Sequence, residues 1–270
     1  MGTNTYSLLV KHPMSSNKRY FYICVVQMRT MEINFYEELG SDVRFAEGLT
    51  GCLHCGTCTA ICPAAEFYNY DPRIIAETVQ TRDNKQIHEL LTGNMIWYCG
   101  ECMSCKTRCP RGNAPGLLIM ALRALSVRTG LFVESEKGRQ QLVLKRTMGE
   151  WILKYGYCLY REEMSIEDHP EQGPTWEWQN KNLEKLFERF GVKYRGDEPG
   201  PLRRIPQEAL DEVKRIFDVT GATDLFNFIE DQSAEKAEEM GLQFDKTLNC
   251  GYVNQIYNLD SGIHTKDHTI

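Results

Sequence analysis

The residues with the most distinctive chemistry in this chain are its cysteines. Eight of the eleven fall in two runs, CLHCGTCTAICP and CGECMSCKTRCP, which both read C-x2-C-x2-C-x3-C-P. Thiolates at this spacing are typical of the bacterial ferredoxin run, which holds iron–sulfur clusters. The sequence therefore predicts two [4Fe–4S] clusters. Their expected ligands are Cys52, Cys55, Cys58, Cys62, Cys99, Cys102, Cys105 and Cys109.

The spacing within a run also predicts which cysteines share a cluster. Gaps of two residues let one tight loop aim three sulfurs at three irons, whereas the fourth cysteine lies beyond that loop and ligates the other cluster. Pro63 and Pro110 then turn the chain out of each loop. Crossed fourth ligands hold the runs together and bring the clusters close enough for electron exchange. The predicted sets are Cys52, Cys55, Cys58 and Cys109 for one cluster and Cys99, Cys102, Cys105 and Cys62 for the other.

Structural zinc is the alternative interpretation, because zinc also takes four thiolates. Zinc sites usually pair C-x2-C units and do not call for a third cysteine at the same interval. Two complete copies of the run, each with its proline, therefore favour iron–sulfur clusters.

Several residues within the runs have two interpretations. Gly51, Gly56 and Gly100 allow backbone N–H groups to approach sulfur, and the hydroxyls of Thr57 and Ser104 can donate to it. The same residues are also explained by loop sterics alone.

The residues beside the runs are similarly open to two interpretations. His54 is either a pH-sensitive neighbour of a cluster or a solvent-facing loop residue. Trp97 and Tyr98 are expected to shield a cluster from water. A group of positive charges either offsets cluster charge and docks a partner or is ordinary surface. This group is Lys106, Arg108 and Arg111.

The segment between the two runs is predicted to be helical. Asp71 is a typical N-cap with Pro72 in the first turn, a break follows at 82–84, and a second helix ends at Gly93. Small bacterial ferredoxins join their runs with hairpin strands. The helical spacer therefore predicts a mainly α fold, an α-helical variant of the two-cluster ferredoxin.

The remaining elements follow from periodicity and from Gly and Pro positions. Residues 31–50 indicate a short strand or irregular lead-in, and little periodicity is found in 250–270. Residues 165–180 and 195–205 are predicted loops. Further helices are predicted from Pro115 to Gly130, over 134–155, over 181–190, from Pro206 and over 222–240. The helix from Pro115 is expected to turn Leu117, Leu118, Ala121 and Leu125 inward. The helix over 181–190 is expected to turn Leu183, Leu186, Phe187 and Phe190 inward, and the helix from Pro206 is expected to turn Leu210, Val213 and Phe217 inward.

Composition and charge limit the class of protein. The chain has 270 residues, 42% hydrophobic and 25% charged, which is ordinary for a globular protein with a real core. Its net charge is −6, but residues 1–160 carry 18 Lys and Arg against 14 Asp and Glu, whereas 161–270 carry 13 against 23. The sequence has no basic stripe of the kind that indicates nucleic-acid binding. The acidic half is either a solvated surface or a docking face for a basic partner.

Cysteine usage and hydropathy predict a reducing, cytoplasmic location without a transmembrane helix. No stretch approaches 18 consecutive apolar residues. The apolar run 20–28 only loosely imitates a signal peptide, and Met31 begins a more typical start. Isolated cysteines are expected to be buried thiols. These are Cys24, Cys158 and Cys250. The predicted domains are an N-terminal extension (1–30) that can lie upstream of the true start, a helical ferredoxin-like domain (31–160) and a helical C-terminal extension for subunit contacts (161–270).

The stretch GCLHCGTCTAICPAAEFYNYDPRIIAETVQ, followed by IWYCGECMSCKTRCPRG, resembles the C subunit of heterodisulfide reductase, including the reductase-like complexes of sulfur oxidisers. The resemblance covers about residues 45–150 and implies a helical ferredoxin fold in which these eight cysteines are the ligands. It implies a non-catalytic protein that relays electrons between a flavin-bearing A subunit and a catalytic B subunit with CCG motifs. This sequence has no CCG motif, so the resemblance places the active site on a partner.

Two other functions are weighed against the relay. An iron–sulfur protein of a membrane-associated, quinone-linked oxidoreductase is the alternative, although a plant-type C-x4-C-x2-C domain and membrane helices are both missing from the sequence. A stand-alone enzyme is disfavoured, because we find no G-x-G-x-x-G after a strand, no P-loop and no H-E-x-x-H.

Overall fold

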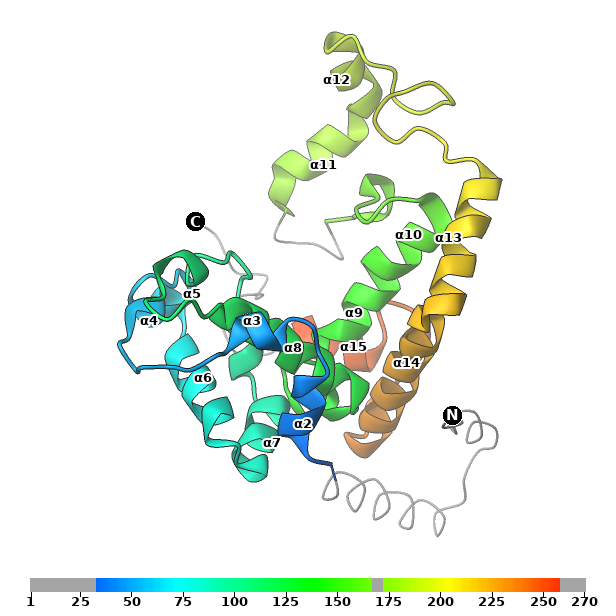
Figure 1. The fold of residues 1–270 in the computed structure, drawn as a ribbon. Coiled ribbons are helices and arrows are strands. Elements are labelled where there is room, and N and C mark those ends of the chain that lie inside the picture. The colour runs from blue at the N-terminus through cyan, green and yellow to red at the C-terminus, as the bar shows by residue number, and fades with distance from the viewer. Residues whose placement is uncertain (1–32, 167–171, 258–270) are drawn as a thin grey trace.

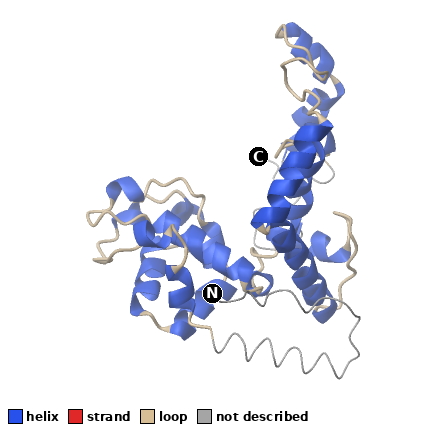
Figure 2. Cartoon of the chain, turned by 45° about the vertical axis from the view of Figure 1, so that its right-hand side comes forward, coloured by secondary structure: helices blue, strands red, loops and turns tan. Residues whose placement is uncertain are grey.

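The computed structural model describes residues 33–166 and 172–257, and these form helices and loops with no strand (Figure 2). The prediction of a mainly α fold is confirmed. The first half contains α2 (Phe35–Gly40), α3 (Phe45–Gly48), α4 (Thr57–Ala60), α5 (Ala64–Phe67), α6 (Pro72–Thr81), α7 (Asn84–Thr92), the 3-10 turns η1 (Met95–Tyr98) and η2 (Lys106–Arg108), and α8 (Pro115–Arg128). The second half contains η3 (Leu131–Glu134), α9 (Gln140–Leu144), the π-turn η4 (Lys145–Gly149), α10 (Glu150–Tyr155), η5 (Arg161–Glu163), α11 (Gly173–Lys181), α12 (Leu183–Arg189), α13 (Gln207–Thr220), α14 (Ala222–Glu239) and α15 (Gly251–Tyr257).

The helices gather into two regions, with α8 in the middle of the first (Figure 1). Helices α2 to α7 surround α8 and carry the two cysteine loops. Helices α13 and α14 run one after the other along the opposite side of the molecule, next to α9 and α10. Helices α11 and α12 project beyond both regions.

The sequence predicts a strand or irregular lead-in at 31–50, and this prediction is wrong where the structure describes the segment. Asn34 caps α2 by accepting a hydrogen bond from the Glu37 N–H (3.3 Å). Phe35 and Leu39 of α2 are buried. A helix of six residues is too short to show its periodicity in sequence, so packing decides its structure.

The two spacer helices form as predicted. Asp71 accepts a hydrogen bond from the Arg73 N–H (2.9 Å) at the start of α6. Arg82 ends that helix with φ of 61°, and Asp83 caps α7 by accepting from the Lys85 N–H (2.9 Å). Gly93 follows the end of α7. These caps are local, which explains why sequence could predict them.

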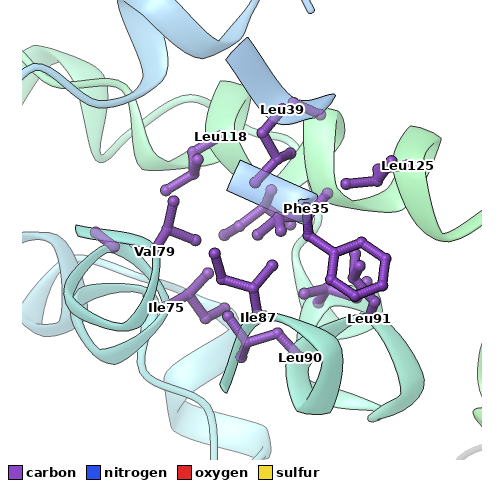
Figure 3. Packing of buried hydrophobic residues seen from close by; sticks show 14 of the residues in the cluster. Phe35, Leu39, Ile75, Val79, Ile87, Leu90, Leu91, Leu118 and Leu125 are labelled. Atoms are coloured by element: carbon purple, nitrogen blue, oxygen red, sulfur yellow. The ribbon is translucent and has the colours of Figure 1, made fainter. Parts of the chain in front are cut away.

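The first hydrophobic core lies between α2, α6, α7 and α8 (Figure 3). Leu118, Ala121 and Leu125 of α8 are buried as predicted, whereas Leu117 is half-buried. Ile119 and the rest of this helix are also largely apolar, because α8 contacts neighbours on several sides. Cysteines of both loops pack against this core.

The sequence predicts a single helix over 134–155, but the segment begins with a turn and becomes helical only at α9. A side chain at Gly138 would collide with the Phe132 carbonyl oxygen. Ser135 instead donates from its hydroxyl to Asn94 Oδ1 (2.7 Å). The tight turn therefore depends on contacts distant in sequence.

A second core joins residues from both sides of position 160. It comprises Val127, Phe132, Val133, Leu142, Val143, Ile229, Ala237, Cys250, Tyr252, Val253 and Ile256. Helices α13 and α14 form close to the predicted bounds, and Gly241 follows with φ of 69°. Residues 251–257, where the sequence shows little periodicity, form α15, and its Tyr252, Val253 and Ile256 lie in this core. Residues 258–270 lie outside the described residues.

The projecting arm differs from the prediction in part. The loop predicted at 165–180 contains α11, whose Trp176 donates from Nε1 to the Met164 carbonyl (2.9 Å). Helix α12 forms as predicted, but only Leu183 of its expected inward face is buried, and Phe190 is 75% exposed. The 195–205 loop is confirmed.

Among the described residues, no helix has both the length and the apolar character needed to cross a bilayer. Cys24 and the apolar run 20–28 lie outside the described residues.

Candidate functional site

The two cysteine loops have the same backbone conformation. Residues at equivalent positions, 47 apart, adopt positive φ: His54 (58°) matches Glu101 (54°), and Gly56 (75°) matches Met103 (57°). These left-handed residues curl each loop around its cysteines. The sequence points to Gly56, but Gly100 has no positive φ, and the strained pair in the second loop escapes prediction because it contains no glycine.

The curled loops aim backbone amides at sulfur. The N–H of His54 donates to Cys52 Sγ, and the N–H of Glu101 donates to Cys99 Sγ, both at 3.4 Å. Such amide hydrogen bonds stabilise the thiolate charge that a metal ligand must carry.

Hydroxyl groups contact the second cysteine of each loop, as the sequence suggested. Thr57 Oγ1 lies 3.3 Å from Cys55 Sγ, and Ser104 Oγ lies 3.5 Å from Cys102 Sγ. These contacts lower the pKa of Cys55 and Cys102. Both thiols are exposed, so each loop presents one cysteine at the surface.

The third cysteine of each loop lies deeper. Burial raises the pKa of Cys58 and of Cys105. Metal binding must therefore supply the free energy that removes these protons.

The first set of predicted ligands surrounds one hollow. The hollow is lined by Cys52, Cys55 and Cys58 of the first run and by Cys109 of the second, with Arg73, Arg111 and Asn113 at its wall. Cys62, the fourth cysteine of the first run, is not among the lining residues. The fold thus brings the fourth cysteine of the second run to the first loop.

The second set gathers near the core between the loops. Cys105 lies within electrostatic range of Cys99 and Cys102. Cys62 and Cys99 both pack on the first core, and the Tyr70 side chain interacts with both of them. Cys62 therefore shares Tyr70 as a neighbour with Cys99 of the second run.

The first loop is held by two amide side chains that sequence reasoning missed. Buried Asn113 accepts from the Thr50 N–H (2.8 Å) and donates to the Gly51 carbonyl (2.9 Å). Gln80 of α6 accepts from the Cys52 N–H (2.5 Å). Asn113 follows the second run in sequence, so it ties the two runs together without any metal.

The second loop is held by Arg123, which sequence reasoning also missed. Its guanidinium donates to the carbonyls of Ile96 (2.7 Å) and Cys99 (2.6 Å) and to the Glu101 carboxylate (2.7 Å). It also lies 5.6 Å from the centre of the Trp97 ring. The available signal was an arginine in the middle of the otherwise largely apolar sequence of α8.

Aromatic side chains cover the second set on the core side. The Tyr68 and Tyr98 rings stack at 4.5 Å, and the Tyr70 ring meets Tyr98 edge-on at 6.4 Å. Trp97 packs against both hydrophobic cores. These positions suit the shielding that the sequence suggested for Trp97 and Tyr98.

The charged residues near the loops form ion pairs or line the first hollow. His54 Nδ1 lies 3.1 Å from the Glu77 carboxylate with its side chain 41% exposed, and Lys106 pairs with Glu47. Arg111 lines the first hollow.

Of the isolated cysteines, Cys158 and Cys250 lie in the part of the chain that the structure describes, and neither lines the first hollow. Cys250 is buried as predicted, whereas Cys158 is exposed, so the prediction for Cys158 is wrong. Cys158 follows the end of α10 in a surface segment whose neighbours give it no cover.

The donor chemistry fits iron–sulfur clusters. In the described residues, no group of three or more His, Cys, Asp or Glu side chains is spaced to hold a single metal ion. A [4Fe–4S] cluster makes a different demand, since each thiolate binds a different iron and the sulfurs accept hydrogen bonds from loop amides. Thiols, amide donors and curled loops are all present here.

Comparison with known proteins agrees with this site. Residues 48–113 match the 4Fe-4S dicluster domain, so the chain carries an iron–sulfur module. The C subunit of the ferredoxin:CoB-CoM heterodisulfide reductase of Methanosarcina acetivorans is 30% identical over 200 residues, covering 74% of this chain and 73% of that protein. A protein of Archaeoglobus profundus that is similar to the heterodisulfide reductase C subunit is 32% identical over 60% of this chain and 78% of its own.

A third relative is the iron-sulfur C subunit of the CoB–CoM heterodisulfide reductase of Methanopyrus kandleri, 28% identical over 72% of this chain and 87% of that protein. The alignment of 200 residues with the Methanosarcina protein is longer than the cysteine-bearing stretch alone, so the likeness includes helices beyond the site. The chain belongs to the family of heterodisulfide reductase C subunits.

Proposed function

We propose that the eight cysteines hold two [4Fe–4S] clusters with crossed fourth ligands. One observation carries this proposal: Cys109 lines the same hollow as Cys52, Cys55 and Cys58, whereas Cys62 does not. The expected ligands are Cys52, Cys55, Cys58 and Cys109 for the first cluster and Cys99, Cys102, Cys105 and Cys62 for the second. When bound, the clusters store and release single electrons.

Metal analysis tests the cluster count. After anaerobic purification of the full chain, we expect about eight iron and eight acid-labile sulfide per chain, with an EPR spectrum of two interacting reduced clusters. About two zinc and no sulfide would overturn the proposal.

The family membership supports a role as an electron-relay component of an oxidoreductase complex. We infer that this chain passes electrons between a flavin-bearing A subunit and a catalytic B subunit with CCG motifs, and does no bond chemistry itself. The exposure of Cys55 on one loop and Cys102 on the other supports the idea, since each loop offers a face to a different partner.

The regions beyond the cysteine loops then serve assembly. In this proposal residues 31–160 are the cluster-binding unit, and 161–270 supply subunit contacts. Trp178 and Phe190 of the projecting arm support a contact role, because they are 57% and 75% exposed. Thiolate ligation and the exposed Cys158 thiol suit a reducing compartment, which we propose is the cytoplasm.

Affinity purification from the native cell tests the relay. We expect a flavoprotein and a CCG-motif protein to copurify with the chain, and the reduced flavoprotein to reduce its clusters. Recovery of a quinone-linked membrane oxidoreductase in their place would favour the alternative function and contradict the relay between the flavin-bearing and CCG-motif proteins.

A further inference from the structure

A tyrosine hydroxyl is buried beside the second cysteine set without an ordinary partner. Tyr70 is 4% exposed, and its hydroxyl oxygen makes no hydrogen bond that meets normal geometric limits with the described residues. Buried polar groups are nearly always paired, so an unpaired hydroxyl calls for an explanation.

The groups that interact with this hydroxyl are thiols. Burial raises the pKa of Tyr70 far above its ordinary value, and the Cys99 and Cys62 sulfurs raise it further. A tyrosine hydroxyl has one proton to donate to a hydrogen bond. Cys99 and Cys62 come from different runs, and both pack on the same core as Tyr70.

The ring is held so that its hydroxyl cannot swing to solvent. Tyr70 lies edge-on to the Tyr98 ring, with 76° between the ring planes. Its backbone N–H donates to the Tyr68 carbonyl (2.7 Å), and the next residue, Asp71, caps α6. The backbone on either side of Tyr70 is thus fixed by contacts within the segment between the two runs.

We propose that Tyr70 donates an O–H···S hydrogen bond to the ligand sulfur of Cys99 and so raises the reduction potential of the second cluster. The proposal rests on the ligation proposed above, in which Cys99 and Cys62 bind that cluster. A hydrogen bond to ligand sulfur stabilises the more negative state, which is the reduced one. Reduction takes up one electron, and the Tyr70 proton stays on its oxygen. Among the described residues that line the first hollow there is no tyrosine.

The variant Tyr70→Phe in the full chain tests this assignment. Phenylalanine keeps the ring contacts, so both clusters should assemble with unchanged iron and sulfide content. At a fixed applied potential, the reduced-to-oxidised ratio of one cluster should fall by about tenfold, which is about 59 mV for a one-electron couple. The same cluster should respond to Ser104→Ala, which alters the second loop. Tyr68→Phe is the matched control, because it removes a hydroxyl from the same aromatic group, and it should leave both potentials unchanged.

Pulsed EPR of the native chain gives a second readout. After transfer to deuterated buffer, we expect a slowly exchanging proton coupled to the reduced second cluster, since Tyr70 is buried, and we expect Tyr70→Phe to remove it. Equal potentials in Tyr70→Phe and the native chain, or no slowly exchanging coupled proton, would overturn the role of Tyr70 while leaving the two-cluster proposal intact. Failure of the native chain to hold two clusters would instead overturn the proposed function.

Discussion

At the scale of single residues, the two loops reach one shape with different side chains. The left-handed position that Gly56 occupies in the first loop is taken by Met103 in the second, whereas the other left-handed position holds a non-glycine residue in both loops. A left-handed non-glycine residue costs about 1–2 kcal/mol. The second loop therefore needs stronger external support, and Arg123 provides it.

The backbone requirement predicts unequal effects of alanine at two glycines. Gly56→Ala should lower the free energy of unfolding by about 1 kcal/mol, because φ is 75° there although no atom crowds the site. Gly100→Ala is the matched control: its surroundings are equally open and its φ is not positive, so its effect should stay within about 0.5 kcal/mol. Denaturant midpoints of the cluster-loaded chain measure both, and equal effects would contradict the conformational argument.

The hydroxyl contacts predict selective tuning of the two proposed clusters. Thr57→Ala should lower the potential of the first cluster and Ser104→Ala that of the second, because each removes a hydroxyl that contacts one ligand sulfur and can donate to it once it is a thiolate. Redox titration followed by EPR distinguishes the two. If either variant shifts both potentials equally, the hydroxyls do not act on single clusters.

At the scale of elements, α8 does more than fill the core. Its Arg123 fastens the second cysteine loop through two carbonyls and one carboxylate. Lysine keeps the charge but cannot reproduce the planar fork of donors.

Arg123→Lys should therefore weaken one cluster selectively. We expect partial loss of iron from the second cluster and full retention of the first, measured as iron and sulfide content with EPR. Arg128→Lys changes an exposed arginine in the last turn of the same helix; it is the control and should retain both clusters. Full retention of iron in both clusters of Arg123→Lys would show that the second loop does not need the Arg123 hydrogen bonds.

The elements also show what sequence could and could not predict. Helices α6, α7, α8 and α14 carry local caps or glycine stops, and the sequence predicts them well. Helices α2 and α15 are short, and α11 resembles a loop in sequence because Gly173 and Pro174 open it. Their structure depends on packing against segments distant in the chain, which leaves no periodic pattern in the local sequence.

At the scale of the whole molecule, the C-terminal helices are fastened to the rest by an ion pair between a buried arginine and a partly buried glutamate. Arg146 donates from Nη2 to the Glu230 carboxylate (2.8 Å) and from Nη1 to the Thr247 carbonyl (2.7 Å), and only 3% of its side chain is exposed. It also lies 4.8 Å from the centre of the Phe244 ring. One residue in the π-turn thus contacts both α14 and the segment that leads to α15.

Removing one partner of this pair should destabilise the molecule strongly. Arg146→Met should cost about 3 kcal/mol, the lower end for a broken buried pair, because Lys145 still lies 2.8 Å from the partly buried Glu230 carboxylate. Lys181→Met breaks the exposed pair with Glu177 and should cost no more than about 0.5 kcal/mol. Chemical unfolding followed by circular dichroism compares them. Similar costs would contradict an anchoring role for Arg146.

Some residues of the candidate site can likewise be predicted from the local sequence, and others depend on contacts between distant parts of the chain. The eight cysteines and the two hydroxyls could be identified from spacing alone. Asn113, Arg123 and Tyr70 could not, because each acts on a loop at least 20 residues away through contacts that only the folded chain creates.

The most direct test of the crossed arrangement compares variants of the fourth cysteine of each run with variants of the second cysteine of each run. Cys109→Ser, Cys62→Ser, Cys55→Ser and Cys102→Ser are each reduced anaerobically, and EPR identifies the cluster that remains. We predict that Cys109→Ser loses the same cluster as Cys55→Ser, and that Cys62→Ser loses the same cluster as Cys102→Ser. If Cys109→Ser instead matches Cys102→Ser, each run binds its own cluster and the crossed arrangement is wrong.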